Sequence, residues 1–545
     1  MGVVSHEISY VMLAVLACVA VVIIYLGVKY KKYICAVLSA LQTSLLIWFV
    51  LGRGDLIYID NNLYADGFSW IMILASGVTG MLICVYALSF IRRPSFYLFM
   101  LISLTAMIGI TVSNNLLWLY LFWEIMTLCT FFLIGFDKTP EAVKNSFCAL
   151  SVNLLGGLAF VFAIVIIGSY FFTIELSATL MYRQIPQYSF NAGVPVALLA
   201  FAGLVKAAQM PFSRWLLGAA SAPSPAFALL ASSTTAPAGA FLIIKLSPAL
   251  GLNMAGVMVM LAGGVTFLMA SLAATARENE KDVLAYSAIA SLGLIVACGG
   301  VGTYSAVWAG ILLIIFHAIT KSLLFLCVEA SENKAARGYV APFMMIGIAG
   351  MFLAPFGMLI SRWAALVAFA DAKNILLILL VCFGSAATIF YGTRWLGRAA
   401  ADMQDKEEER PEVCRERLAP IWTLSLSIIV VCLFLPSVSS MWVVPYLEES
   451  FFGEPFIIAG TATTRILWAI LAIIVMAPML FFGKTKKRIV PVYAPAFDGR
   501  ISHESPDLGR YFGEHRMNMI GGVINTIAIA AVFSVAIAVS GGVLL

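Results

Sequence analysis

The chain has 545 residues, of which 62% are hydrophobic and only 11% are charged, and its mean hydropathy is +1.00. A soluble domain carries about 25% charged residues, so this composition excludes a water-soluble globule and indicates a polytopic membrane protein. A net charge of +5 over this length excludes a nucleic-acid footprint. The ten cysteines form no C-x-x-C pair and no P-loop motif is present, so neither a metal cluster nor ATP-driven pumping is predicted.

Apolar runs of the length of a membrane span occur along the whole chain, since a spanning helix needs about 20 mostly apolar residues. We expect about sixteen helices and an all-α polytopic fold. The runs are 7–28, 33–52, 67–91, 96–113, 114–135, 145–172, 193–218, 223–247, 251–275, 283–301, 303–329, 339–370, 374–396, 419–441, 462–483 and 517–544. Pro211 and Pro355 interrupt the seventh and twelfth runs. A proline removes a backbone hydrogen bond, so we expect a broken helix at each of them.

Basic residues alternate between the loops. One set of loops, which includes 29–32, 92–93, 138–144, 277–281, 334–337, 394–417 and 484–516, carries most of the Lys and Arg. The positive-inside rule places this set in the cytoplasm and both termini on the outer face of the cell membrane. The hydrophilic segments are a cytoplasmic loop at 397–418 and a connector at 484–516. Neither is large enough for a catalytic domain, so redox or hydrolytic chemistry would belong to partner chains.

Five charged or titratable residues fall inside the apolar runs: Glu124, Lys206, His317, Lys321 and Arg362. Such groups are costly within a bilayer and are functional candidates by default. Burial destabilises a charged lysine and a nearby carboxylate stabilises it, so a changing distance between Glu124 and Lys206 would load and release a proton. His317 and Lys321 are four residues apart and share one helix face. The pattern predicts a proton path and no metal or catalytic residue.

Static roles for the same residues stay open. Glu124 and Lys206 would also serve as a fixed ion pair that sets helix register. His317 alone would also suit a packing role. Arg362 holds its proton too tightly to release it, so a structural anchor or a fixed charge is the favoured role there.

Four segments together resemble the antiporter-like subunits of respiratory complex I, multisubunit cation/proton antiporters and energy-converting hydrogenases. They are LYLFWEIMTLCTFFLIGF at 119–136, KAAQMPFSRWLLGAASAPSPAFALL at 206–230, KDVLAYSAIASLG at 281–293 and HAITKSLLF at 317–325. They cover about residues 100–400 in the order of the family. WLLGA at 215–219 and APFGMLISRWAAL at 354–366 look most like the large membrane subunit of energy-converting nickel–iron hydrogenases.

The resemblance implies two inverted five-helix repeats, here helices 4–8 and 9–13, each with one broken helix. The implied units are an N-terminal segment 1–95, repeats 96–247 and 251–396 with one half-channel each, the loop 397–418 and C-terminal helices 419–545. It also implies that Glu124 and Lys206 modulate one half-channel, with Lys321 on the central axis and His317 beside it.

Three positions depart from the family pattern. Ala231 stands where a histidine is frequent, and Pro237 where a lysine is frequent. Arg362 replaces the usual exit-side Lys or Glu. A proton path would then need ordered water, helped by the hydroxyl side chains at Ser232, Ser233, Thr234 and Thr235.

The resemblance implies an ion-translocating subunit, most simply for protons, of a redox-driven complex such as a ferredoxin-linked hydrogenase. Its partners would be other membrane and peripheral subunits, the lipid bilayer and H⁺ or Na⁺. No cofactor is expected in this chain, and nickel–iron and iron–sulfur centres are expected in partner subunits. The alternatives are a subunit of a cation/proton antiporter without a redox partner and a scaffold subunit that no longer conducts.

Overall fold

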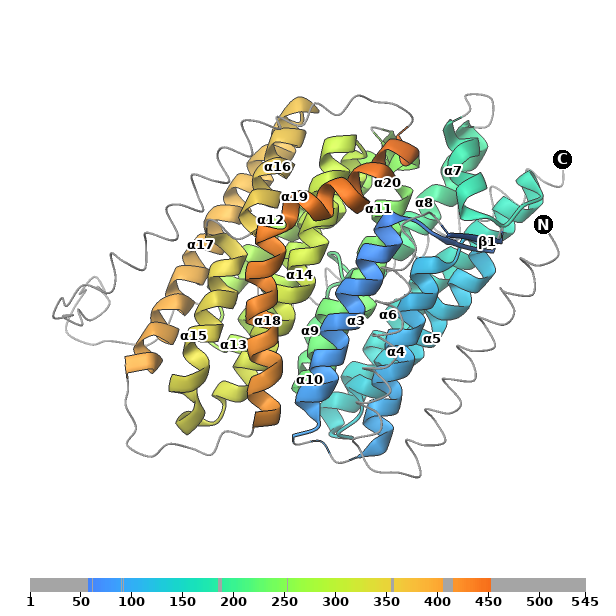
Figure 1. The fold of residues 1–545 in the computed structure, drawn as a ribbon. Helices are drawn as coiled ribbons and strands as arrows, with labels where there is room; N and C mark the ends of the chain where they lie inside the picture. Colours follow the sequence, from blue (N-terminus) through green and yellow to red (C-terminus); the bar gives the residue numbers. More distant parts are fainter. Residues whose placement is uncertain are drawn as a thin grey trace.

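The computed structural model describes residues 57–451, except 61, 90, 92, 185–188, 252, 354–356 and 405–414. Long helices run side by side and form one bundle (Figure 1). In chain order the elements are β1 (Ile57–Asp60), β2 (Leu63–Ala65), α3 (Gly67–Ala87), α4 (Pro94–Val112), α5 (Leu116–Ile134), α6 (Pro140–Phe171), α7 (Leu176–Gln184), α8 (Ser189–Lys206), α9 (Arg214–Gly218), η1 (Ala219–Ser221), α10 (Ser224–Ala228), η2 (Leu229–Ser233), α11 (Thr235–Leu250), α12 (Met254–Thr275), α13 (Glu280–Val301), α14 (Tyr304–Ser331), α15 (Lys334–Phe352), α16 (Gly357–Asp371), α17 (Ile375–Gln404), α18 (Arg415–Leu433), α19 (Leu435–Val438), η3 (Ser439–Val443) and α20 (Val444–Ser450).

Ten helical segments of the described part are long and apolar enough to cross a membrane. The pair formed by α18 and α19–α20, bent by 71°, gives an eleventh. The chain is therefore a multi-pass membrane protein, as its composition predicts. The runs expected at 7–28, 33–52, 462–483 and 517–544, the connector 484–516, residues 405–414 of the cytoplasmic loop and Pro355 lie outside the described residues, so sixteen helices remain a prediction.

A short antiparallel hairpin departs from the all-α expectation. Strands β1 and β2 precede the first described span and pair Tyr58 with Tyr64. Tyr64 donates its hydroxyl to the Glu449 carboxylate at the far end of the described chain. Burial and this carboxylate raise the pKa of Tyr64 well above its ordinary value. Alternation of apolar and polar residues over four positions is too short a signal to stand out between apolar runs.

Polar side chains mark where many of the helices begin. The side-chain oxygens of Asp66, Asn115, Thr139, Asn253 and Asn279 accept backbone N–H groups in the first turns of α3, α5, α6, α12 and α13. These caps satisfy donors that have no partner within the helix. They mark the residue at which each of these helices begins.

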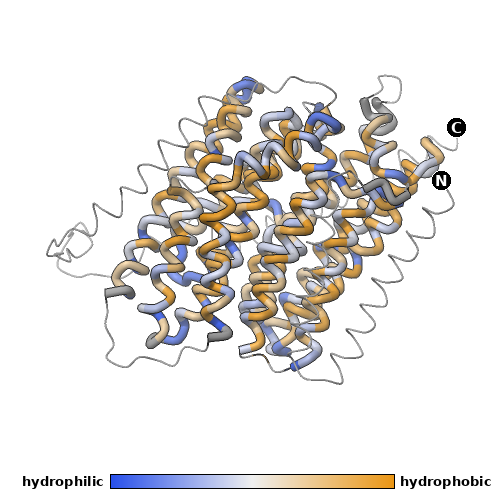
Figure 2. Tube along the Cα trace, in the orientation of Figure 1, coloured by the Kyte–Doolittle hydropathy of each residue, from blue (hydrophilic) through white to orange (hydrophobic). Residues whose placement is uncertain are grey.

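Helix α14 lies in the middle of the bundle, beside α3, α13 and α18 (Figure 1). Its most apolar 18-residue window is completely buried. Neighbouring α12 and α13 approach closely through glycines: a Cβ atom on Gly263 would lie 2.5 Å from the Ala297 nitrogen. Hydrophilic residues gather at the two ends of the bundle, and a few lie along its interior (Figure 2). Those interior polar groups make up the candidate site.

Candidate functional site

Lys206 is the last residue of α8, at an interruption of the helix. The next helix, α9, starts at Arg214, so Pro211 lies within the non-helical stretch. Gly239 of α11 packs directly against this stretch, because a Cβ atom there would lie 2.4 Å from the Ala207 nitrogen. A bare glycine is required for this approach. It brings the end of α8, and with it Lys206, into the protein interior.

The Lys206 ammonium is buried, with 1% of the residue exposed, and is held by neutral groups of α5. Its Nζ donates to the Trp123 carbonyl and to the Thr127 hydroxyl, each at 2.8 Å. The same atom lies 4.3 Å from the centre of the Trp123 ring, within the range of a cation–π contact. Among the described residues, the Lys206 ammonium is thus bound by neutral groups of α5 and forms no ion pair.

Glu124, the predicted partner of Lys206, is half-buried on the same helix α5. The described residues include no ion pair between the two side chains, although the Lys206 charge attracts the Glu124 carboxylate. Glu124 Oε1 is buried without a hydrogen bond from a described residue. It lies against Gly157 of α6, where a Cβ atom would come within 2.2 Å of it. A direct, fixed ion pair is therefore not the arrangement seen here.

A π-helical turn, η2, occupies the place where the family pattern has its histidine. The turn exposes the Ala231 carbonyl, which lies 3.0 Å from His317 Nε2. Single π turns within α-helices occur frequently at functional sites.

The four hydroxyl residues around η2 face different helices, and Ser232 Oγ lies 3.2 Å from Ser233 Oγ. Ser232 Oγ lies 2.8 Å from Ser322 Oγ of α14, and Ser233 Oγ lies 2.7 Å from Thr79 Oγ1 of α3. Thr234 donates back to the Leu229 carbonyl. Thr235 alone turns to α5, where it lies 2.8 Å from Thr130, one turn beyond the Lys206 contact at Thr127. The predicted water-path lining is thus split among three helices.

His317 is 1% exposed and makes a hydrogen bond at each ring nitrogen. Nδ1 lies 2.7 Å from the Ser291 hydroxyl of α13. Because the Ala231 carbonyl can only accept, Nε2 carries a proton, and the neutral ring satisfies both contacts if Ser291 donates to Nδ1. The histidine therefore connects η2 with α13.

Lys321, one turn along α14 from His317, is likewise 1% exposed. Its Nζ donates to the Ser287 hydroxyl at 2.8 Å and faces the Met351 sulfur at 3.1 Å. Ser287 is one turn from Ser291 on α13, so this helix face serves both His317 and Lys321. As at Lys206, the ammonium is held by neutral groups.

Arg362 of α16 is 6% exposed, and its Nε–H donates to no described residue. The guanidinium lies 5.6 Å from the centre of the Phe267 ring of α12. Its charge acts on Lys321 and on the Tyr391 hydroxyl of α17. It is a buried fixed cation in the second half of the row.

One buried ion pair was not expected from the sequence. Lys245 of α11 donates to the Asp66 carboxylate that caps α3, and the two side chains are 11% and 4% exposed. Its ammonium also lies 5.3 Å from the centre of the Tyr446 ring. The partners are 179 residues apart, so no local pattern indicates the pair.

Comparisons with known proteins agree with this arrangement of helices. The sequence profile of the family "NADH:quinone oxidoreductase/Mrp antiporter, TM" matches residues 113–388. The A1 subunit of a Na⁺/H⁺ antiporter of Staphylococcus saprophyticus is 28% identical over 413 residues, covering 68% of this chain and 51% of the relative. A probable A/B subunit of a K⁺/H⁺ antiporter of Rhizobium meliloti is 31% identical over 287 residues, covering 51% of this chain and 28% of the relative. This chain therefore covers about half the length of the first relative and less than a third of the second.

Solved structures share the fold. The Mrp complex of Dietzia matches with a TM-score of 0.70 at 21% identity, over 98% of this chain and 63% of that chain. The archaeal membrane-bound sulfane sulfur reductase matches with a TM-score of 0.71 at 20% identity, over 85% of this chain and 100% of that chain. The matched family profile spans half of this sequence and includes the row from Glu124 to Arg362. The chain belongs to the family of membrane subunits shared by NADH:quinone oxidoreductases and Mrp antiporters.

Proposed function

We propose that this chain is an ion-translocating subunit of a multisubunit cation/proton antiporter, and that protons move along its buried row of charged residues. The relatives described as Na⁺/H⁺ and K⁺/H⁺ antiporter subunits support the antiporter assignment. The fold shared with the Mrp complex supports the assembly with other subunits. The lipid bilayer and H⁺ or Na⁺ complete the expected set of partners.

The observation that carries the proposal is the state of Lys206. Its ammonium is buried at a helix interruption and bound only by the neutral oxygens of Trp123 and Thr127. Glu124 lies nearby with a buried oxygen that accepts no hydrogen bond from a described residue. Burial without a charge partner favours loss of the proton, whereas approach of the carboxylate favours its retention. A small movement of either side chain therefore changes the charge state of Lys206.

The proton would pass from Lys206 toward Lys321 through α5, η2 and α14. Thr130 and Thr235 continue from the Thr127 contact, and ordered water would carry the proton from Thr235 to His317, whose Nε2 faces the Ala231 carbonyl. Ser291 and Ser287 then lead to Lys321. Arg362 would supply a fixed positive charge that helps Lys321 to release its proton. Two inverted repeats, residues 96–247 and 251–396, are the proposed framework for the two halves of this path.

A redox-driven complex is the second candidate. The full length of the matched chain in the sulfane sulfur reductase, described as an archaeal respiratory membrane complex, is covered by this fold. In such a complex, nickel–iron or iron–sulfur centres would reside in partner subunits, and their electron transfer would drive the same row. Co-purification with subunits that carry these centres, and their electron paramagnetic resonance signals, would favour this candidate over the antiporter.

The test is proton movement in proteoliposomes that contain the assembled complex with Lys206→Ala. We expect proton flux to fall by at least about tenfold, because a positioned proton carrier commonly contributes a factor of about 100 or more. Lys144→Ala, which removes an exposed lysine from α6, is the matched control and should leave the flux unchanged. Unchanged flux with Lys206→Ala, at unchanged assembly, would identify a scaffold subunit and overturn the proposal.

A further inference from the structure

A charged pocket of about 430 Å³ opens where α13 begins, α14 ends, α15 begins and α17 ends. It lies at the end of the bundle that carries the basic loops 277–281 and 334–337. Its wall includes Glu278 and Lys281 of the α12–α13 corner, Glu332 after α14, Arg337 of α15, and Arg398 of α17. The pocket is therefore polar, and it opens beside the helix that holds Lys321.

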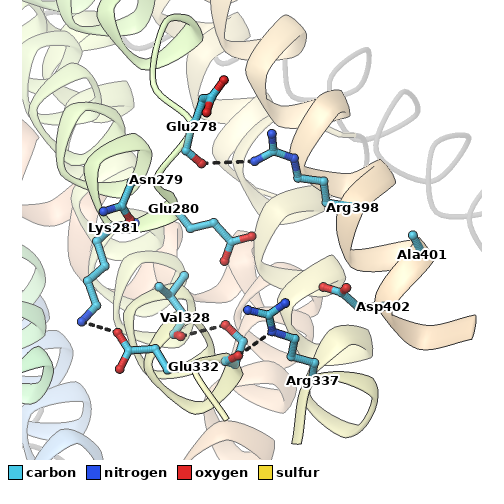
Figure 3. A pocket seen from close by; sticks show the side chains of 11 residues that line it. Glu278, Asn279, Glu280, Lys281, Val328, Glu332, Arg337, Arg398, Ala401 and Asp402 are labelled. Carbon is cyan, nitrogen blue, oxygen red and sulfur yellow. Dashed lines mark hydrogen bonds and ion pairs between the residues drawn. The ribbon is translucent and has the colours of Figure 1, made fainter. Parts of the chain in front are cut away.

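Most charged groups of the wall already have partners. Lys281 lies 2.6 Å from the Glu332 carboxylate and 3.7 Å from Glu329. Arg337 donates to the Ser331 carbonyl, and Arg398 donates to the Glu278 carbonyl (Figure 3). These contacts join the four helix ends around the pocket.

Glu280 differs from these residues, because its side chain points into the middle of the pocket (Figure 3). It faces Asp402 and Arg398 of α17 and Arg337 of α15, whose charges act on it. The described residues include no ion pair that fixes its carboxylate. The indole of Trp395 lies beside the Glu280 carboxyl and acts on it as a weak donor, although its buried Nε1 donates no hydrogen bond of full geometry to a described residue.

A column of spaced polar side chains leads from Glu280 toward Lys321, and the buried apolar Val283 and Leu284 lie between Glu280 and Ser287 on α13. On α13, Glu280, Ser287 and Ser291 recur at helical spacing and share one face. On α17, Trp395 and Tyr391 share the facing side: Trp395 lies beside Glu280, and Tyr391 lies beside Ser287.

The inner end of this column, away from the pocket, is the Ser287 hydroxyl, which accepts a hydrogen bond from Lys321 Nζ at 2.8 Å. Seven residues of α13 separate Glu280 from Ser287, a rise of about 10 Å. About three waters at ordinary hydrogen-bond spacing would bridge that length. The side chains of Trp395 and Tyr391 offer polar groups beside it.

We propose that the pocket is the opening through which protons on the basic-loop side reach Lys321, with Glu280 as the side chain that passes them inward. This inference rests on the proposed function, since it needs Lys321 to exchange protons. It adds a route that enters the row at its middle, through α13 and α17. A carboxylate inside an open pocket with room for several water molecules can take a proton from solvent and donate it to a water chain.

The first experiment compares Glu280→Gln and Glu280→Asp in proteoliposomes that contain the assembled complex. Glu280→Gln keeps the shape but cannot exchange a proton, so we expect proton flux to fall about tenfold. Glu280→Asp should retain most of the flux, which a purely structural role would not predict. Glu332→Gln removes a carboxylate from the same pocket and is the matched control, with flux within about twofold of the parent protein. Parent-like flux in Glu280→Gln would overturn the inference.

A second experiment applies if Glu280→Gln does not assemble. Ala401→Cys places a thiol in the pocket wall, and Gly397→Cys places one on the same helix where nothing lies within 4 Å of the added Cβ atom. A bulky, membrane-impermeant methanethiosulfonate reagent should slow proton flux when bound at 401 and leave it unchanged at 397. Full labelling at 401 without loss of flux would contradict the inference.

Lys206→Ala separates the two proposals in the same preparation. Loss of flux with Lys206→Ala but not with Glu280→Gln would refute only the pocket route. Unchanged flux with both variants would refute translocation by this chain altogether.

Discussion

The two halves of the row bury a lysine in similar ways but surround it with different charges. Lys206 lies near a carboxylate, Glu124, whose buried oxygen has no hydrogen bond from a described residue. Lys321 lies near a second cation, Arg362, and the groups it touches are the neutral Ser287 and Met351. Both ammonium groups therefore depend on neutral acceptors, but only the first has an opposite charge within reach.

This difference assigns distinct roles to the halves. An opposite charge that approaches and withdraws can switch the charge state of Lys206, whereas a fixed like charge favours neutral Lys321 at all times. The first half is thus suited to gating and the second to release. The following predictions test this contrast, from the largest expected effect to the smallest.

The helix interruption that carries Lys206 has no tolerance for a side chain at Gly239. In Gly239→Ala the new Cβ atom would lie 2.4 Å from the Ala207 nitrogen and 2.5 Å from the Gly203 oxygen, so α8 and α11 must separate. We expect destabilisation of about 3 kcal/mol, typical of a badly overpacked site. Thermal unfolding of the purified complex would measure it.

Gly350→Ala in α15 is the control for this change. Its Cβ atom would lie 3.5 Å from Thr320, an ordinary contact near Lys321. Its melting temperature should match that of the parent protein. Equal stability of the two variants would show that the close approach at Lys206 is not required.

Neutralising Glu124 or Arg362, the charged neighbours of the two lysines, should change the proton flux by different amounts in the two halves. Glu124→Gln removes the carboxylate that stabilises protonated Lys206, so proton flux should fall about tenfold. Arg362→Gln removes a like charge from the surroundings of Lys321, and the effect should be smaller, about threefold. Initial rates of proton uptake into vesicles would measure both. A larger loss for Arg362→Gln would reverse the assigned roles.

Removing single hydroxyl groups should have smaller and unequal effects. Ser287→Ala takes away the only oxygen that Lys321 contacts among the described residues, whereas Thr127→Val leaves Lys206 bound to the Trp123 carbonyl. A hydrogen bond to a charged group contributes about 1.5–3 kcal/mol. We expect Ser287→Ala to slow transport more than Thr127→Val does. Equal rates would show that water replaces the Ser287 hydroxyl.

The smallest expected effect lies outside both halves, at Tyr64. Its raised pKa keeps the phenol neutral in the folded state where the unfolded phenol ionises, so this contribution to stability is present below about pH 10 and is lost as the pH rises further. Tyr64→Phe should remove that alkaline loss and leave proton flux unchanged. Melting temperatures between pH 8 and pH 11 would show the difference, which corresponds to about 1 kcal/mol at most in the free energy of unfolding. A slowed flux in Tyr64→Phe would show that the hairpin takes part in transport.

The sequence predicts the buried row well because each member stands out against apolar neighbours. Lys206 precedes the interruption at Pro211, and the spacing of His317 and Lys321 places both on one face of α14. The hydrogen-bond partners of these residues cannot be predicted from neighbouring positions in the sequence. Whether Lys206 contacts Glu124 or the Trp123 carbonyl depends on side-chain orientation at a helix packed across the bundle.

Other features depend on segments that meet only in the folded chain. The π turn at 229–233 has no marker in the sequence, yet it turns the Ala231 carbonyl toward His317. The pocket around Glu280 is formed by four helix ends, from residue 278 to residue 402. The ion pair of Lys245 with Asp66 joins residues 179 positions apart, so it has no local signal in the sequence.

The central claim is that both halves belong to one proton path. Its most direct test is proton flux in vesicles containing the complex with Lys321→Met, in which Glu124 and Lys206 stay intact. A single path predicts a loss of flux as complete as that of Lys206→Ala. Flux at the parent rate would show that protons cross the membrane through the first half alone, and would contradict the account.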